Sequence, residues 1–223
     1  PLADLWAEAR ENGRLPGPEA RARAESLVGW RLLELDPVER TARLPRKEMA
    51  LDLGGIAKGY VLDEALDELR QEGIDRALVD AGGDIAVGAP PPRQDPDSTA
   101  PVSNSSLSDS SGARGWTVET PSGRTLTLSH AAVATSGDSQ QFVEIGGTRY
   151  SHIVDPRTGL GLTHRTAVTV VAATGLAADA YATALSVMGP EDGRQFAAHR
   201  PGLRAYFYAP NETAEEASDA ADR

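Results

Sequence analysis

The stretch LDLGGIAKGYVLD, residues Leu51–Asp63, decides how this 223-residue chain is organised. An apolar, strand-like run carries Asp52, stops at Gly54-Gly55 and restarts as a helix with Lys58 in its first turn. Glycine has no Cβ, so the backbone at such a break can approach a ligand closely. The unpaired N–H groups of a helix N-terminus favour phosphate, and Lys58 adds a positive charge there. The pattern fits a phosphate-binding turn, and it also fits an ordinary strand-turn-helix connection.

Periodicity predicts the other elements. Apolar residues at three- and four-residue steps predict a helix over Ile56–Glu72. Further helices are expected over Pro1–Arg10, Gly17–Leu27, Gly175–Val187 and Glu191–His199. Strands are expected over Arg31–Leu35, Thr41–Leu44, Ala77–Val79, Ile85–Val87, Trp116–Glu119, Thr125–Leu128, Ala132–Ala134, Ala167–Ala172 and Ala205–Tyr208. Helices and strands interleave without a regular βαβ rhythm, which favours an α+β fold over a doubly wound sheet.

The composition is that of an ordinary globular protein, with 25% charged and 40% hydrophobic residues. The net charge of −11 and the lack of a basic stripe argue against a nucleic-acid partner. The chain has no cysteine, which excludes disulfides and thiolate metal sites. No apolar run approaches the roughly 18 residues that a membrane-spanning helix needs.

We predict one domain over residues 1–209. Two segments of the chain differ from the rest in composition. Residues 89–114 hold five prolines and seven serines, and too few bulky apolar residues to offset the entropy of ordering. We therefore expect a disordered insertion there. Asn211–Arg223 holds five acids and one arginine, so we expect an acidic disordered tail over residues 210–223.

Asp179 and Thr183 stand four residues apart in an expected helix, so their side chains lie on one face. A carboxylate and a hydroxyl, joined by a backbone carbonyl from elsewhere, are the oxygen ligands that a hard cation prefers. The alternative is a polar helix face, with Thr183 bonded back into its own helix. Asp179 has no evident partner in the sequence, so its loss is expected to cost little stability.

His152 lies in YSHIVDPRTG, residues Tyr150–Gly159. An imidazole beside an Asp-Pro-x-Thr-Gly turn can transfer a proton near neutral pH or bind a phosphate oxygen. It can also be a structural histidine. Asp155 and Thr158 are expected to fix the turn through an Asx-type hydrogen bond. The other three histidines have no such setting and are interpreted as structural or surface residues: His130, His164 and His199.

Two glycine-containing segments stay open to two interpretations. Gly82 and Gly83 in DAGGDIAVG (Asp80–Gly88) form either a tight turn between strands or a close backbone contact with a ligand. Ser136 in ATSGD (Ala134–Asp138) offers a phosphate contact or ends a strand. The chain has no G-x-S-x-G elbow, no G-x-G-x-x-G and no P-loop, so serine-hydrolase, Rossmann and Walker functions have no support.

Five segments, taken together and in this order, resemble the ApbE family, the FAD:protein FMN transferases. They are Leu51–Asp63, Asp80–Gly88, Ala134–Asp138, Tyr150–Gly159 and ADAYATAL at Ala178–Leu185. The resemblance covers about residues 1–189 and is interrupted once near the middle. It implies an α+β fold of mixed or antiparallel sheets with helices packed around them, incomplete at the N-terminus. Because PLADLW resembles an internal family segment, we expect an upstream region with an export signal and part of the nucleotide pocket.

The resemblance also implies a function. Such an enzyme uses Mg²⁺ to cleave FAD, passes FMN to a Thr or Ser hydroxyl of an acceptor protein and releases AMP. The acceptor carries a Ser/Thr-Gly-Ala-Thr-like motif. Mg²⁺ is assigned to Asp179, Thr183 and the backbone oxygen of Gly55, and His152 is the active-site histidine. Contacts with FAD are implied for Asp52, Lys58, Gly82, Gly83, Ser136 and His152.

Two other functions remain open. One is an FAD pyrophosphatase that uses the same site with water as the nucleophile. The other is a non-catalytic flavin-binding protein, because part of the expected pocket lies outside this chain. The resemblance implies a periplasmic or cell-envelope location, with membrane anchoring only through the expected upstream region. The sequence leaves a cytoplasmic location open.

Overall fold

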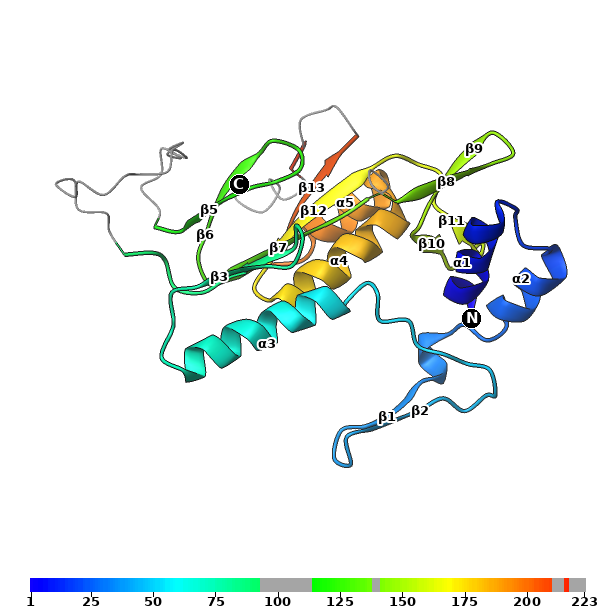
Figure 1. Cartoon of the computed structure of the whole chain (residues 1–223), viewed down its shortest axis with the longest axis horizontal. Coiled ribbons are helices and arrows are strands. Elements are labelled where there is room, and N and C mark those ends of the chain that lie inside the picture. Colours follow the sequence, from blue (N-terminus) through cyan, green and yellow to red (C-terminus); the bar gives the residue numbers. More distant parts are fainter. Residues whose placement is uncertain (93–113, 138–140, 210–214, 217–223) are drawn as a thin grey trace. The chain divides into compact units, whose positions relative to one another are not determined.

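The computed structural model describes residues 1–92, 114–137, 141–209 and 215–216 (Figure 1). The sequence predicts one domain over residues 1–209, and the contacts of the chain cluster in two compact units. The first unit is Pro1–Leu53 with Gly137–Arg165, and the second is Gly54–Ser136 with Thr166–Arg223. Each unit has its own hydrophobic core.

The second unit is built on a six-stranded sheet in the order β14-β13-β12-β7-β4-β3. Every neighbouring pair is antiparallel. In chain order the strands are β3 Leu78–Asp80, β4 Ile85–Val87, β7 Ala131–Ser136, β12 Ala167–Ala172, β13 Arg204–Tyr208 and β14 Glu215–Glu216. The helices are α3 Ala57–Gln71, α4 Gly175–Met188 and α5 Pro190–Ala198. The predicted α+β class with antiparallel sheets is confirmed.

Strand β12 lies at the centre of the core, and all six of its residues are buried. Its side chains alternate between the two faces, as the pleat of a strand requires. Val168 and Val170 pack with Leu185 of α4. Val171 packs with Leu126 on the other face, where the hairpin β5 Trp116–Glu119 and β6 Thr125–Leu128 covers the sheet. Burial on both faces explains why this segment is β-branched and has no polar alternation.

The described residues of the first unit form two α-helices, a 3₁₀ turn and three two-stranded hairpins. Its elements are α1 Leu2–Asn12, α2 Pro18–Glu25, the 3₁₀ turn Trp30–Leu32, β1 Glu34–Asp36, β2 Thr41–Arg43, β8 Phe142–Ile145, β9 Thr148–Ser151, β10 Val154–Asp155 and β11 Leu160–Gly161. Trp6 of α1 is 1% exposed and packs against Tyr150 with a ring-centroid distance of 5.5 Å. Its indole Nε1 donates to the carbonyl oxygen of Ser151 at 3.0 Å. This tryptophan therefore joins α1 to the β8–β9 hairpin.

Some local predictions are wrong. Leu51–Leu53 is irregular, and Leu51 and Leu53 are 52% and 54% exposed, because no strand pairs with this run in the described part of the chain. The expected strand Arg31–Leu35 begins only at Glu34, after the 3₁₀ turn. The hairpins β8–β9 and β10–β11 are not among the strands that the sequence predicts.

The two segments expected to be disordered lie mostly outside the described residues, which leave out 93–113, 210–214 and 217–223. The prediction is wrong for Glu215–Glu216, which forms β14 and pairs with Tyr206–Phe207 of β13. The open edge of β13 offers unpaired backbone groups, which explains the pairing. No helix in the described residues is long and apolar enough to cross a membrane.

The two ends of the predicted insertion lie together. The indole Nε1 of Trp116 donates to the carbonyl oxygen of Ala89 at 2.9 Å. We expect that replacing residues 91–113 with Gly-Ser-Gly changes the melting temperature by no more than about 7 °C. The loop shortens by about three doublings at about 0.6 kcal/mol each, and 1 kcal/mol corresponds to about 2–4 °C in a chain of this size. Differential scanning calorimetry checks this. A larger fall would mean that the replaced residues pack on the second unit.

Candidate active site

Helix α3 begins at Ala57, directly after the Gly54-Gly55-Ile56 turn, with Lys58 in its first turn as predicted. The helix runs beside α4 in the second unit (Figure 1). A Cβ on Gly59 would lie 2.1 Å from the carbonyl oxygen of Gly175, and a Cβ on Gly175 would lie 2.4 Å from that of Gly59. Only glycine fits at either position, so this crossing fixes how close the two helices come.

Asp179 lies on α4 at this crossing and is only 3% exposed. Its Oδ2 accepts a hydrogen bond from the N–H of Gly59 at 3.0 Å. Burial raises the pKa of Asp179 and nearby Asp84 raises it further, which outweighs the lowering by Gly59 and Lys58. A carboxylate in such a setting is stabilised by a cation.

Thr183 lies one turn further along α4, on the same face as Asp179. The main chain of Gly55 packs against it, because a Cβ on Gly55 would lie 3.2 Å from Thr183 Oγ1. Thr183 Oγ1 is also 3.1 Å from Ser136 Oγ, at the end of β7. The structure therefore brings together the three predicted metal ligands and Ser136.

Asp84 is a site residue that the sequence analysis did not single out. It is 2% exposed, and the ammonium of Lys58 lies 2.6 Å from its Oδ2. Among the described residues no donor is aligned for a hydrogen bond at this oxygen, so the contact with Lys58 is an ion pair. Oδ1 accepts from the N–H of Thr135 at 3.2 Å. The only sequence feature that could have indicated Asp84 is its position directly before a buried strand.

Gly82 and Gly83 form the turn of the β3–β4 hairpin. Their φ angles of 76° and 104° lie in the region that favours glycine, and both residues are exposed. The N–H of Gly83 donates to Asp80 Oδ1 at 2.8 Å. The tight-turn interpretation is confirmed, and the proposed ligand contact stays a prediction.

Two predicted site residues, Asp52 and His152, belong to the first unit. Asp52 lies exposed in the irregular run before α3. His152 is half-buried, and its Nδ1 is 3.2 Å from the carbonyl oxygen of Gln141. The structure thus brings together Gly55, Lys58, Ser136, Asp179 and Thr183 in the second unit.

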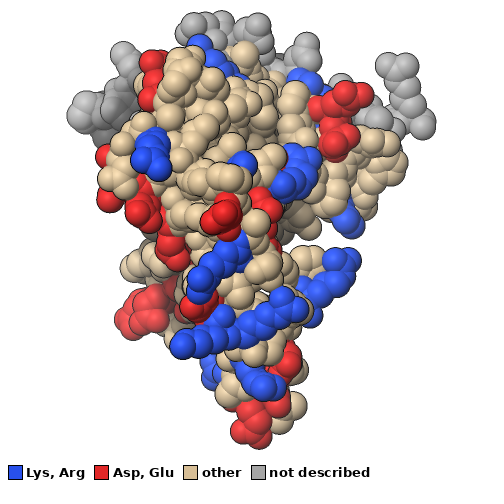
Figure 2. All heavy atoms as spheres, turned by 90° about the vertical axis from the view of Figure 1, so that its right-hand side faces the viewer, with Lys and Arg blue, Asp and Glu red and all other residues tan. Residues whose placement is uncertain are grey.

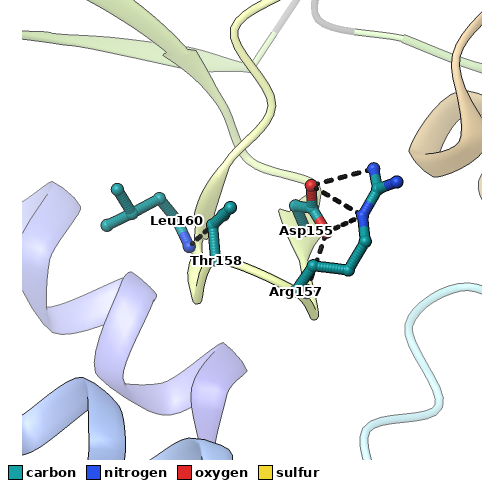
Figure 3. Close-up of polar contacts among 4 residues, drawn as sticks. All are labelled: Asp155, Arg157, Thr158 and Leu160. Carbon is teal, nitrogen blue, oxygen red and sulfur yellow. Dashed lines mark hydrogen bonds and ion pairs between the residues drawn. The ribbon is translucent and has the colours of Figure 1, made fainter.

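The turn after His152 is held by its own side chains (Figure 3). Asp155 Oδ1 accepts from the N–H of Arg157 at 2.8 Å, and the guanidinium of Arg157 contacts both carboxylate oxygens. Thr158 Oγ1 accepts from the N–H of Leu160 at 3.3 Å. Burial raises the pKa of Asp155, but the contacts with Arg157 outweigh this and leave the pKa lowered. The predicted turn-fixing role of Asp155 and Thr158 is confirmed.

The donor set fits a hard cation. It offers the carboxylate of Asp179, the hydroxyl of Thr183 and the main chain of Gly55, which are oxygen donors of the kind that Mg²⁺ prefers. No group of three or more His, Cys, Asp or Glu in the described residues could hold a metal ion, so a site built from acids and imidazoles is not seen there. A cation here would depend on one carboxylate together with neutral oxygens.

Charge is distributed unevenly between the units. The second unit contains 20 acids and 10 basic residues, whereas the first contains 13 and 12. On the face shown in Figure 2, basic side chains gather in the lower half with acids among them. Within the second unit, the half-exposed Lys58 forms an ion pair with the buried Asp84.

Comparison with known proteins shows which family the chain belongs to. The model of the ApbE family matches residues 1–207. A FAD:protein FMN transferase of Treponema pallidum is 32% identical over 98% of this chain, and one of Klebsiella pneumoniae is 30% identical over 95%. The chain spans 61% and 62% of the length of these two relatives.

Solved structures show the same fold. The flavin transferase ApbE from Vibrio cholerae superposes with a TM-score of 0.70 at 28% identity, over 96% of this chain and 65% of that one. The ApbE protein from Thermotoga maritima gives a TM-score of 0.74 at 28% identity, over 96% and 66%. The likeness therefore covers nearly the whole chain and about two thirds of the neighbours.

Proposed function

Because the chain belongs to the ApbE family, we propose that it takes part in FMN transfer from FAD to a protein. The proposed reaction cleaves the pyrophosphate of FAD, attaches FMN to a Thr or Ser hydroxyl of the acceptor and releases AMP. One observation carries the proposal. The Gly55 turn, the Lys58–Asp84 pair and the Asp179/Thr183 face of α4 meet at one helix crossing.

Asp179, Thr183 and the backbone oxygen of Gly55 would hold Mg²⁺. When bound, the ion would neutralise charge that develops on the phosphate oxygens. The N–H of Gly59 bonds to Oδ2 of Asp179 and helps to fix the orientation of the carboxylate. Ser136 bonds to the Thr183 hydroxyl and orients it.

Lys58 would bind the pyrophosphate. Its side chain is half-exposed, while that of its partner Asp84 is 3% exposed. The ammonium therefore lies at the surface, beside a buried carboxylate. The N–H groups of the first turn of α3 add positive potential on the same side. Asp84 itself accepts from the N–H of Thr135 and so holds the Lys58 ammonium in place, from where it would meet the phosphate.

The remaining assignments rest on the resemblance. Asp52, Gly82 and Gly83 would contact FAD, and Ser136 would border it. His152 would assist proton transfer from the acceptor hydroxyl or position the phosphate. The acceptor protein would carry a Ser/Thr-Gly-Ala-Thr-like motif. We propose a periplasmic or cell-envelope location on the same ground.

The test is to incubate the 223-residue chain with FAD, Mg²⁺ and a peptide with the acceptor motif. AMP is measured by chromatography and the peptide by mass spectrometry. Release of AMP with one FMN added to the peptide supports transfer. AMP and free FMN with an unmodified peptide would identify a pyrophosphatase. FAD binding without AMP release in Mg²⁺ would identify a non-catalytic flavin-binding protein.

Lys58→Met is expected to raise the KM for FAD about tenfold or more, because a charge-assisted bond to phosphate contributes about 1.5–3 kcal/mol. The substitution also leaves Asp84 buried without its charge partner, so its melting temperature should fall. The double variant Lys58→Met/Asp84→Asn is the matched control, since it removes both charges. Its stability should recover while the KM stays high. An unchanged KM in both variants would remove Lys58 from the phosphate site.

A further inference from the structure

The α3 segment and α4 meet at three levels, spaced by four residues along each chain segment. The levels pair Gly55 with Thr183, Gly59 with both Asp179 and Gly175, and Asp63 with Gly175 and Leu176. The order is antiparallel, so position 55 faces the later part of α4 and position 63 faces its start. Residues four apart lie on one helix face, which makes these contacts a single seam.

Asp63 forms the last level of this seam. Its Oδ1 accepts from the N–H of Gly175 at 2.6 Å, and its Oδ2 accepts from the N–H of Leu176 at 2.8 Å. These are the first two N–H groups of α4, which have no partner inside the helix. Thr174 caps α4 from within its own segment by accepting from Ala177 at 3.2 Å. Asp63 therefore adds a cap that comes from another helix.

The middle level leaves no room for a shift. The backbones of Gly59 and Gly175 touch so closely that neither position admits a Cβ. A slide of one helix by a single residue is about 1.5 Å. Such a slide would break both hydrogen bonds of Asp63 and also the bond from Gly59 to Asp179. The level that caps α4 and the level that holds Asp179 are therefore coupled through one register.

We propose that Asp63 is a positioning residue for the cation site. By capping α4 it sets the register of α3 against α4, and this register places Gly55 and the N–H of Gly59 against Thr183 and Asp179. Asp63 stands eight residues after Gly55, which lies in the turn before α3, so it acts on the ligands only through the register. The inference rests on the proposed function for the identity of the metal ligands.

The test uses Mn²⁺ alone as a paramagnetic probe of the site and two variants, Asp63→Ala and Asp63→Asn. The 223-residue chain is titrated with Mn²⁺ and followed by electron paramagnetic resonance. In the metal-free protein, hydrogen exchange of the Gly59 amide reports its bond to Asp179. The control is Asp67→Ala, an exposed acid one turn further along α3 that pairs with Arg70.

We expect Asp63→Ala to weaken Mn²⁺ binding about tenfold or more, as loss of a residue that supports the ligands does at other metal sites. We also expect it to accelerate hydrogen exchange of the Gly59 amide. Asp63→Asn keeps one carbonyl acceptor and should show a smaller effect of the same kind. Asp67→Ala should change neither readout. Because the Asn variant keeps part of the cap, it answers the question if the Ala variant does not fold.

Wild-type Mn²⁺ affinity and wild-type Gly59 exchange in both Asp63 variants would overturn the proposal, even if the melting temperature falls. That result would make Asp63 a stabilising cap and nothing more. Absence of Mn²⁺ binding in the wild-type protein would instead contradict the proposed metal site. In that case the exchange of the Gly59 amide still decides whether Asp63 sets the register.

Discussion

Asp179→Asn is expected to reduce Mg²⁺-dependent AMP release from FAD on the order of 100-fold, and to leave the melting temperature close to that of the wild-type protein. The asparagine keeps a carbonyl oxygen for the N–H of Gly59, which donates to Asp179 Oδ2 in the structure. It removes the one charge among the three proposed ligands. The activity is measured as AMP released over time at saturating FAD, with and without EDTA.

The alanine variant is expected to behave differently. Asp179→Ala leaves the N–H of the buried Gly59 without its partner, which costs about 1–3 kcal/mol of stability. The sequence-based premise that Asp179 is an unpaired acid is therefore wrong, and we now expect its loss to cost stability. The bond that corrects it joins residues 120 positions apart, which no local pattern reveals.

Asp192→Asn, an exposed acid in the first turn of α5, is the matched control and should leave AMP release unchanged. Wild-type activity of Asp179→Asn, or activity of the wild-type protein that survives EDTA, would exclude the metal site. Equal loss of activity in Asp179→Asn and in the control would point to the general acidity of the second unit.

The sequence predicts well whatever depends on residues close together in the chain. The boundaries of α3 and α4 differ by one residue from the periodic patterns that predict them, because one apolar face of each helix packs on the core. Strand β12 matches its prediction in full, since a run buried on both faces is continuously apolar. The four-residue spacing of Asp179 and Thr183 likewise predicts their common face.

The sequence does not show which residues far apart in the chain become hydrogen-bond partners in the fold. Asp63 meets the start of α4 across 112 residues, and Asp84 meets Thr135 across 51. In the motif around Lys58 the conspicuous glycines are Gly54 and Gly55, which form the turn. Gly59 passes as one more helix residue, although it is the position at which α3 and α4 touch.

Gly59→Ala is therefore expected to lower stability by about 2 kcal/mol or more, or roughly 4–8 °C in melting temperature. An alanine inside a helix would ordinarily stabilise it by about 0.5–1 kcal/mol over glycine. Here the added Cβ would lie 2.1 Å from the carbonyl oxygen of Gly175 and 2.8 Å from Cβ of Asp179. Both contacts are closer than real Cβ atoms allow, so α3 must move away from α4.

The movement has a consequence for activity as well as for stability. It lengthens the bond from the Gly59 N–H to Asp179 and shifts the Gly55 turn from Thr183, so AMP release should fall at least as far as in Asp179→Asn. Gly17→Ala is the matched control, because a Cβ there meets nothing within 4 Å and its φ of −63° suits alanine. Calorimetry and AMP release are measured on both variants.

A Gly59→Ala protein that melts and reacts like the wild type would mean that the two helices can separate at Gly59 without loss of stability or activity. The proposed ligands could then not depend on the register of α3 against α4.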